Sequence, residues 1–336
     1  MKPTPLFPVP RLVDRPWGGS ALSRWGRDVP RDARCGESWD LASVAGLDSV
    51  LEGSPWHTLS RTAAAEEGAW LGVPGGIFPL LLKLIDARET LSVQVHPSTS
   101  GEGFAPKNEC WVVLEAGPEA FLYAGTRVHL PARELVERLN AGDLDVLQKV
   151  PVKVGDVVVI PAGTIHAITG GLLVAEIQQS SDTTYRVYDW GRVGADGKPR
   201  QLHLTESVEC LSPTPRSDLK PAPVPVAHGR ELLCATPWFA LERLRPASGV
   251  ALPAREGFQI LQVLEAPATL RWSEGERKLE RGACVLLPTD LPVTVCGGTW
   301  LRSFAPDLER EIVAPVLAAG GSREAAMALT AGTFEA

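Results

Sequence analysis

Two histidines stand where they could bind one metal ion. In the stretch LSVQVH, at 91–96, Gln94 and His96 are two residues apart on an expected β-strand. Side chains at that spacing project from one face, about 6–7 Å apart along the strand, so both can reach a common ion. The second histidine, His166, ends the stretch GDVVVIPAGTIH, in which turns on both sides of a short strand set its position.

A carboxylate would complete such a site. Glu109, in KNECW at 107–111, stands at the entrance to the next expected strand, and Glu102 in the preceding loop is a competing carboxylate. Two imidazoles, a carboxylate and an amide oxygen suit zinc or another divalent transition metal. A polar strand face solvated by water is the simpler interpretation of Gln94 and His96, but the second histidine at a turn-defined position favours the metal site.

The elements that must position these residues are mostly strands. Short Val- and Leu-rich runs such as FPLLLKLI, CWVVLEA, DVVVIPA and LLVAEIQQS follow one another, separated by proline and glycine. This pattern is typical of a β-sandwich or barrel. Helices are expected in only a few places. One begins after Pro131 and ends near Asn140, and another covers about 318–330.

An internal repeat organises the chain. The stretch VVLEAGPEAFLY at 112–123 resembles QVLEAPATLRW at 262–272, and 155–166 resembles 282–293. The first copy is longer, by a helical insertion at about 128–150. The proline-rich stretch 212–229 is the expected linker. We therefore expect a catalytic domain at 1–225 and a related domain at 226–336.

The second copy lacks the histidine of the first. Where the first copy has His166, the second has Val293, so the β unit itself does not need an imidazole there. We expect the second domain to carry no metal ligands.

Composition and charge exclude several classes of function. The net charge of −7 offers no basic surface for nucleic acid. No apolar run approaches the roughly 20 residues that span a bilayer, and no signal peptide is recognisable. The six cysteines are scattered without a CxxC pair, which favours reduced core residues. These features predict a cytoplasmic protein, and they leave open whether it is a monomer or a homodimer.

The spacing G-x5-P-x-G-x2-H that ends at His166 is the second motif of the cupin superfamily. The longer blocks RPWGG, CGESWDL, PLLLKLIDARETLSVQVHP, KNECWVV and EIQQSSDTTYRVYDWGR resemble the type I mannose-6-phosphate isomerases in their short bacterial form. The resemblance implies a mainly β fold of two cupin-like jelly-roll units, the first metal-binding and the second degenerate.

The resemblance also implies an activity and its residues. It implies interconversion of mannose 6-phosphate and fructose 6-phosphate with one Zn²⁺ per chain. The implied metal ligands are Gln94, His96, Glu109 and His166, with Glu109 preferred over Glu102 because the K-x-E-C-W pattern matches. The loop between His96 and Glu109 is shorter than is general in the family, so the resemblance does not predict whether the cleft closes over the substrate.

Aldose–ketose isomerisation sets further requirements. Negative charge develops on the two oxygens of a cis-enediolate, a base must move a proton between neighbouring carbons, and the distal phosphate must be held. The catalytic candidates are Arg186, which the resemblance implies is the catalytic arginine, Glu176 and Lys107. The substrate-binding candidates are Ser92, Lys83 and Glu37, and the resemblance implies that Lys107, Lys83 and Ser92 belong to the active-site pocket. The Lys83 ammonium and the Ser92 hydroxyl could donate hydrogen bonds to a phosphate group. Strand alternation places Arg186 and Tyr188 on one face.

Two other functions remain open on sequence alone. One is an Fe(II) cupin oxygenase that uses His96, His166 and Glu109 as a facial triad. The other is a sugar-phosphate-binding or regulatory protein that has lost turnover. Metal analysis together with an isomerase assay separates these alternatives.

Overall fold

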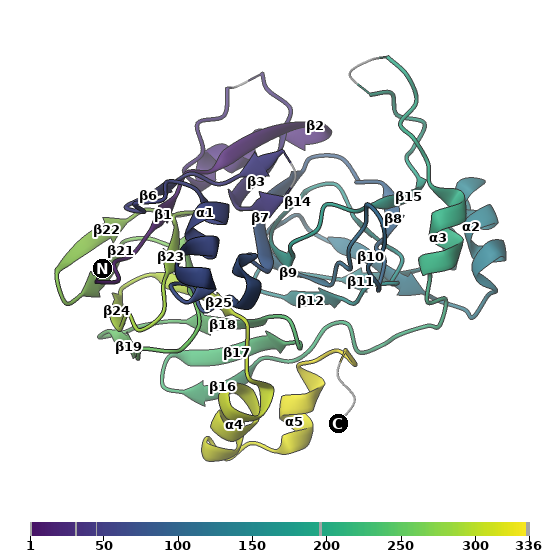
Figure 1. Cartoon of the computed structure of the whole chain (residues 1–336). Helices are drawn as coiled ribbons and strands as arrows, with labels where there is room; N and C mark the ends of the chain where they lie inside the picture. The colour runs from purple at the N-terminus through teal and green to yellow at the C-terminus, as the bar shows by residue number, and fades with distance from the viewer. Residues whose placement is uncertain (1, 31, 45, 195–196, 334–336) are drawn as a thin grey trace.

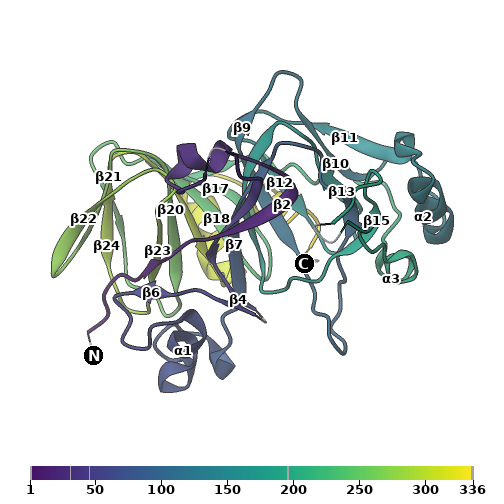
Figure 2. The ribbon, with the colours of Figure 1, turned by 90° about the horizontal axis from the view of Figure 1, so that it is seen from above.

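The computed structural model describes residues 2–30, 32–44, 46–194 and 197–333, and it shows a molecule built mainly of antiparallel β-sheets (Figure 1). This confirms the predicted mainly β fold class. Two halves lie side by side, and four sheets make up most of the fold (Figures 1 and 2). No helix among the described residues has the length and apolar character needed to cross a membrane.

The first half contains a six-stranded and a five-stranded sheet. The six strands, in the spatial order β12-β9-β14-β7-β3-β2, are Val157–Ile160, Glu109–Ala116, Leu172–Gln179, Leu80–Ala87, Cys35–Leu41 and Arg11–Gly19. The five strands, in the order β11-β10-β13-β8-β15, are Leu147–Pro151, Phe121–Thr126, His166–Ile168, Val93–Val95 and Tyr185–Tyr188.

The second half contains a six-stranded and a four-stranded sheet. The first, in the order β16-β17-β18-β25-β20-β23, consists of Val224–Ala227, Arg230–Ala235, Ala240–Leu244, Thr299–Phe304, Gln259–Glu265 and Cys284–Leu287. The second, in the order β19-β24-β21-β22, consists of Val250–Leu252, Val293–Cys296, Ala268–Trp272 and Gly275–Leu279. Two small two-stranded sheets pair β1 (Phe7–Pro8) with β6 (Leu51–Glu52) and β4 (Ser43–Val44) with β5 (Leu47–Asp48).

The strand order of the first half recurs in the second. The series β12-β9-β14-β7-β3-β2 corresponds strand for strand to β23-β20-β25-β18-β17-β16, and β11-β10-β13-β8 corresponds to β22-β21-β24-β19. On this basis we propose that the chain consists of two related jelly-roll units. The boundary expected at 225 falls inside β16, which belongs to the second pair of sheets, so we place it before Val224.

Strand alternation divides the core of the first half into two layers. On β9, Cys110, Val112 and Leu114 face an apolar cluster that also contains Leu241 and Leu301 of the second half. The alternate residues Trp111 and Val113 face the interior between the two sheets of the first half. Glu109 lies two residues before Trp111 and therefore points to the same face of β9. Its carboxylate faces the interior of the sandwich rather than the contact between the halves.

The helices are short and lie outside the sheets. They are α1 (Leu59–Ala64), α2 (Ala132–Asn140), α3 (Leu204–Cys210), α4 (Ala314–Ala318) and α5 (Arg323–Ala328). Short 3₁₀ turns occupy Ala21–Trp25, Ala65–Gly68, Pro74–Gly76 and Leu144–Val146, and a π-helical turn covers Leu308–Val313. In both views α2 and α3 lie together at the end of the first half that is remote from the second (Figures 1 and 2).

The helix predicted after Pro131 is confirmed as α2. Its apolar residues Leu135, Val136 and Leu139 are buried, and the chain leaves the helix at Gly142, whose φ of 85° favours glycine. With the 3₁₀ turn that follows, α2 fills the connection between β10 and β11. The corresponding strands β21 and β22 are joined only by Ser273 and Glu274.

Two other sequence predictions need correction. The single C-terminal helix expected at 318–330 is instead α4 followed by α5, because Gly320 adopts a φ of 84° and the Ser322 side chain accepts a hydrogen bond from Ala325 N to start a new helix. The expected linker at 212–229 contains β16, which pairs with β17 through a turn at Gly229.

Candidate active site

The side chains of His96, Glu109 and His166 converge inside the first half. One potential ligand atom from each lies within 4.8 Å of the others, and all three side chains are buried. His96 follows β8, Glu109 begins β9 and His166 begins β13, where it lies opposite Gln94. The competing carboxylate of Glu102 is exposed and is not part of this group.

The Nδ1 hydrogen bonds of the two imidazoles orient their Nε2 atoms toward Glu109. His96 Nδ1 donates to Thr183 O at 2.9 Å, and His166 Nδ1 donates to Thr164 O at 2.8 Å. Each Nε2 therefore presents a lone pair. The two Nε2 atoms lie 3.4 and 3.3 Å from the buried Glu109 carboxylate oxygens, of which Oε1 has no hydrogen-bond partner among the described residues.

The protonation states match a cation site. Burial, reinforced by the nearby Lys107 ammonium, lowers the pKa of His96 to about 3, and burial lowers the pKa of His166. Burial alone would raise the pKa of Glu109, but the Lys107 ammonium holds it well below its usual range. Neutral imidazoles beside an ionised carboxylate are the donor set that a divalent transition metal requires.

Gln94 lies at the edge of the triad. Its Nε2 is 3.3 Å from His166 Nε2, and its Oε1 accepts a hydrogen bond from Ser92 Oγ at 3.1 Å. Because an amide presents its oxygen or its nitrogen after a half-turn about its last bond, Gln94 can direct Oε1 toward the triad.

Lys107 supplies the positive charge beside the triad. Its Nζ lies 2.8 Å from Glu109 Oε2 and 3.2 Å from His96 Nε2, and the side chain is buried. Burial would lower the pKa of Lys107, but Glu109 and Glu176 raise it. Lys107 is therefore a cation at neutral pH.

A second cluster of buried side chains lies beside the triad and is formed by Glu176 on β14 and Lys83 on β7. Glu176 Oε2 accepts a hydrogen bond from Trp111 Nε1 at 2.9 Å, and Oε1 lies 3.6 Å from Lys83 Nζ. The Lys83 ammonium also lies 4.3 Å from the ring centroid of Trp39. Burial, together with the negative charge of Glu109, raises the pKa of Glu176.

Glu37 is held on β3 by two donors. Its Oε2 accepts hydrogen bonds from Arg15 Nη2 at 2.7 Å and Trp39 Nε1 at 2.8 Å. Burial opposes ionisation of Glu37, but Lys83 and Arg15 outweigh it and lower its pKa to about 2. Glu37 is therefore an ionised carboxylate at neutral pH, and it lines the site.

Arg186 faces the site from β15, directly opposite Gln94 on β8. Burial, with the positive charge of Arg200, lowers its pKa, and its Nε is buried with no hydrogen-bond partner in the part of the chain that the structure describes. The expectation that Tyr188 shares this face is wrong. The pairing shifts between Arg186 and Tyr188, so that Tyr188 lies opposite Val93 and packs in the apolar cluster beside α2.

A cavity of about 170 Å³ adjoins the triad. Most of the predicted site residues line it, namely Glu37, Lys83, Ser92, Gln94, Lys107, Glu176 and Arg186. The structure adds charged residues that the sequence did not single out, namely Arg15, Asp182 and Arg200. Arg15 and Asp182 lie within the sequence blocks RPWGG and EIQQSSDTTYRVYDWGR, which was the available signal, whereas Arg200 had none.

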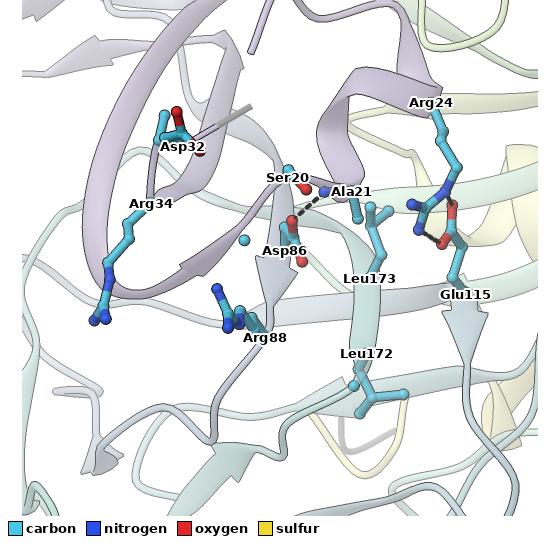
Figure 3. A pocket seen from close by; sticks show the side chains of 13 residues that line it. Ser20, Ala21, Arg24, Asp32, Arg34, Asp86, Arg88, Glu115, Leu172 and Leu173 are labelled. Atoms are coloured by element: carbon cyan, nitrogen blue, oxygen red, sulfur yellow. Dashed lines mark hydrogen bonds and ion pairs between the residues drawn. The ribbon is translucent and has the colours of Figure 1, made fainter. Parts of the chain in front are cut away.

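A larger hollow of about 530 Å³ lies elsewhere on the first half (Figure 3). There, Arg24 pairs with Glu115, and the buried Asp86 accepts a hydrogen bond from Ala21 N at 2.6 Å. Its remaining arginines, Arg34 and Arg88, are exposed. These charges are either paired within the fold or solvated, so the larger hollow shows none of the converging buried donors of the triad.

Comparison with known proteins places the chain in a family. Residues 9–112 match the model of the phosphomannose isomerase type I catalytic domain. The mannose-6-phosphate isomerase ManA of Bacillus subtilis is 33% identical over 309 residues, which is 87% of this chain and 95% of the relative.

Solved structures agree with this relationship. The crystal structure of the mannose 6-phosphate isomerase from Bacillus subtilis superposes with a TM-score of 0.82 at 30% identity, covering 89% of this chain and 99% of that chain. A zinc-bound mannose 6-phosphate isomerase shares the fold with a TM-score of 0.69 at 18% identity, covering 89% and 99%. With this identity over nearly the whole length of a relative, the chain belongs to the type I phosphomannose isomerase family.

Proposed function

We propose that this protein is a zinc-dependent isomerase that interconverts mannose 6-phosphate and fructose 6-phosphate. The observation that carries the proposal is the buried triad of His96, Glu109 and His166 beside a cavity lined by cationic side chains. Family membership supports the same substrate, because the relatives are named for this activity.

One zinc ion per chain would be held by the triad, with Gln94 Oε1 as the fourth ligand. The fit rests on two imidazole Nε2 atoms that present lone pairs, and on a buried carboxylate whose Oε1 has no hydrogen-bond partner among the described residues. The ion supplies a Lewis acid that stabilises negative charge on the substrate oxygens O1 and O2.

Arg186 would stabilise the same developing charge from β15, the strand beside Gln94. Arg186 pairs with Gln94 on the neighbouring strand and lines the cavity, and its buried Nε has no hydrogen-bond partner among the described residues. Donors that are already positioned, and released from water, act most strongly where charge appears only during the reaction. Arg186 therefore contributes to catalysis rather than to the binding of the resting substrate.

Glu176 is our candidate for moving the proton between C1 and C2. One of its oxygens is buried without a hydrogen-bond partner, and its raised pKa makes it a better base than Glu37. Lys107 remains protonated beside Glu109 and would donate to a substrate oxygen. The assignment divides the work between a carboxylate base and an ammonium donor.

Ser92, Lys83 and Glu37 would contact the sugar. Lys83 already balances Glu176 and is not a free phosphate ligand. Ser92 donates to Gln94 Oε1 and would be released for the sugar when that oxygen turns toward the ion. Glu37 is ionised and can accept hydrogen bonds from sugar hydroxyls.

A coupled assay of mannose 6-phosphate conversion, with zinc measured on the same sample, tests the proposal. We expect turnover that is lost on chelation and restored by Zn²⁺. Family membership favours this outcome over the Fe(II) oxygenase and the non-catalytic sugar-phosphate-binding alternatives. Oxygen consumption that depends on Fe(II), or sugar-phosphate binding without turnover, would establish one of those instead.

A further inference from the structure

Two arginines at the outer end of the cavity have no role in the proposed reaction steps. Arg15 lies on β2 and Arg200 on the segment that follows β15. The strands β2 and β15 are the outermost of their sheets, whereas β9 and β13, which carry Glu109 and His166, are inner strands. A ligand that extends from the triad along the cavity therefore has its far end beside Arg15 and Arg200.

We propose that Arg15 and Arg200 form the subsite that holds the phosphate group and so set the preference for phosphorylated sugars. This inference rests on the proposed function and adds the residues that select its substrate.

Both arginines are positioned by carboxylates yet keep donors for a ligand. Arg15 bonds Glu37 at 2.7 Å through Nη2, and Arg200 bonds Asp189 through Nη1 at 3.3 Å. A guanidinium has five N–H donors in a planar fork, so one bond to a carboxylate leaves others that match phosphate oxygens. Asp189 lies outside the cavity lining and acts as a positioning residue for Arg200.

The charge balance of the cavity supports a dianionic ligand. Arg15 and Arg200 both lie near enough to Arg186 to lower its pKa, in addition to the effect of burial. Three guanidinium groups gathered at one cavity repel one another, although the chain as a whole carries a net charge of −7. A bound phosphate relieves this repulsion, and the local positive field attracts it from solution.

The other cations of the cavity are less suited to this task. Lys107 pairs with Glu109 at 2.8 Å, and Lys83 lies between Glu176 and the Trp39 ring. Both are buried near the triad, where the reacting end of the sugar must lie. Arg15 and Arg200 are partly exposed, with side-chain exposures of 32% and 18%, and are therefore accessible to an incoming phosphate.

The experiment uses the zinc-loaded full chain with Arg15→Ala and Arg200→Ala, and inorganic phosphate as the probe. Calorimetry at low salt gives phosphate affinity, and the coupled assay gives KM and kcat for mannose 6-phosphate. Loss of a charged hydrogen-bonding partner should weaken phosphate binding and raise KM by about 10- to 100-fold. The change in kcat should be much smaller, because neither arginine touches the reacting carbons.

Arg11→Ala is the matched control, because Arg11 is an exposed arginine on the same strand as Arg15. It should bind phosphate as the wild type does. Arg15→Lys and Arg200→Lys keep the charge and replace the alanine variants if those do not fold. They should recover only part of the affinity, since an ammonium cannot reproduce the fork.

Unchanged phosphate affinity in both alanine variants, or in both lysine variants if those are used, overturns the subsite. If this occurs while the wild type isomerises mannose 6-phosphate, the proposed function stands and only the subsite fails. If the wild type does not isomerise mannose 6-phosphate and the variants bind phosphate more weakly than the wild type, the anion subsite stands and the proposed function fails.

Discussion

Gln259 lies in the second half at the position that Glu109 takes in the first. Glu109 begins β9 and faces Ile160, the last residue of β12, whereas Gln259 begins β20 and faces Leu287, the last residue of β23. The neighbouring pair is replaced in the same way. His166 faces Gln94 in the first half, and Val293 faces Leu252 in the second.

This replacement predicts one metal ion per chain. Among the residues that the structure describes, His96, Glu109 and His166 form the one group of metal-ligand type that converges. His96→Ala and His166→Ala should each deplete the ion, since either variant leaves the site undercoordinated. His129→Ala, which removes an exposed histidine, should retain it. Elemental analysis that finds two equivalents, or a full equivalent in both ligand variants, would contradict the assignment.

Arg186→Ala should reduce kcat by about 10²–10³ while KM changes far less, because the lost donor acts on charge that develops during the reaction. Arg186→Lys should recover only part of the rate. Zinc content and melting temperature should stay near those of the wild type, and both must be measured on the same preparation. Normal turnover, or inactivity explained by lost zinc or unfolding, would remove this role.

Glu176→Gln should lower kcat by about 10²–10⁴, the usual contribution of a positioned base, while zinc is retained. Burial raises the pKa of Glu176, so the protonated, inactive form persists to higher pH than for an ordinary glutamate. The wild-type kcat should therefore fall as pH decreases through that raised pKa, and Glu176→Gln should lose this acid limb. Glu115→Gln, on β9 outside the cavity lining, is the control. A Glu176→Gln enzyme with wild-type turnover would point to another base.

Each half contains a buried ion pair at corresponding positions, with the acidic and the basic residue exchanged between the two strands. Lys83 faces Glu176 across β7 and β14, and Glu242 faces Arg302 at the corresponding places on β18 and β25. Arg302 Nη1 lies 2.9 Å from Glu242 Oε2, and both residues are buried.

Because no triad adjoins it, the second pair should affect stability and not catalysis. Arg302→Ala leaves Glu242 buried with Arg230 as its remaining ion-pair partner among the described residues, which should cost about 3–5 kcal/mol of unfolding free energy. Arg271→Ala breaks an exposed pair with Glu276 and should cost less than about 1 kcal/mol. Urea denaturation measures both. An Arg302→Ala protein as stable as the control, or a folded one without zinc, would refute this division of roles.

Much of the site could be predicted from sequence because strand alternation is a local property. The two-residue spacing of Gln94 and His96 assigns both to one face wherever the strand lies, and the turns around His166 set its position. The helix after Pro131 was equally predictable, since its apolar spacing and its terminating glycine are encoded within ten or so neighbouring residues.

Other features depend on which distant strands pair, and no local pattern encodes that choice. Arg15 and Arg200 are far apart in the sequence of the first half and line one cavity only because of how the sheets that end in β2 and β15 are placed. The shift in pairing after Arg186, which turns Tyr188 away, exists only in register with β8. Likewise, β16 becomes a strand because β17 supplies its hydrogen-bonding partners, which outweighs the proline-rich composition of the segment. Sequence alone determined which side chains could bind a metal, and tertiary pairing decided which charges surround them.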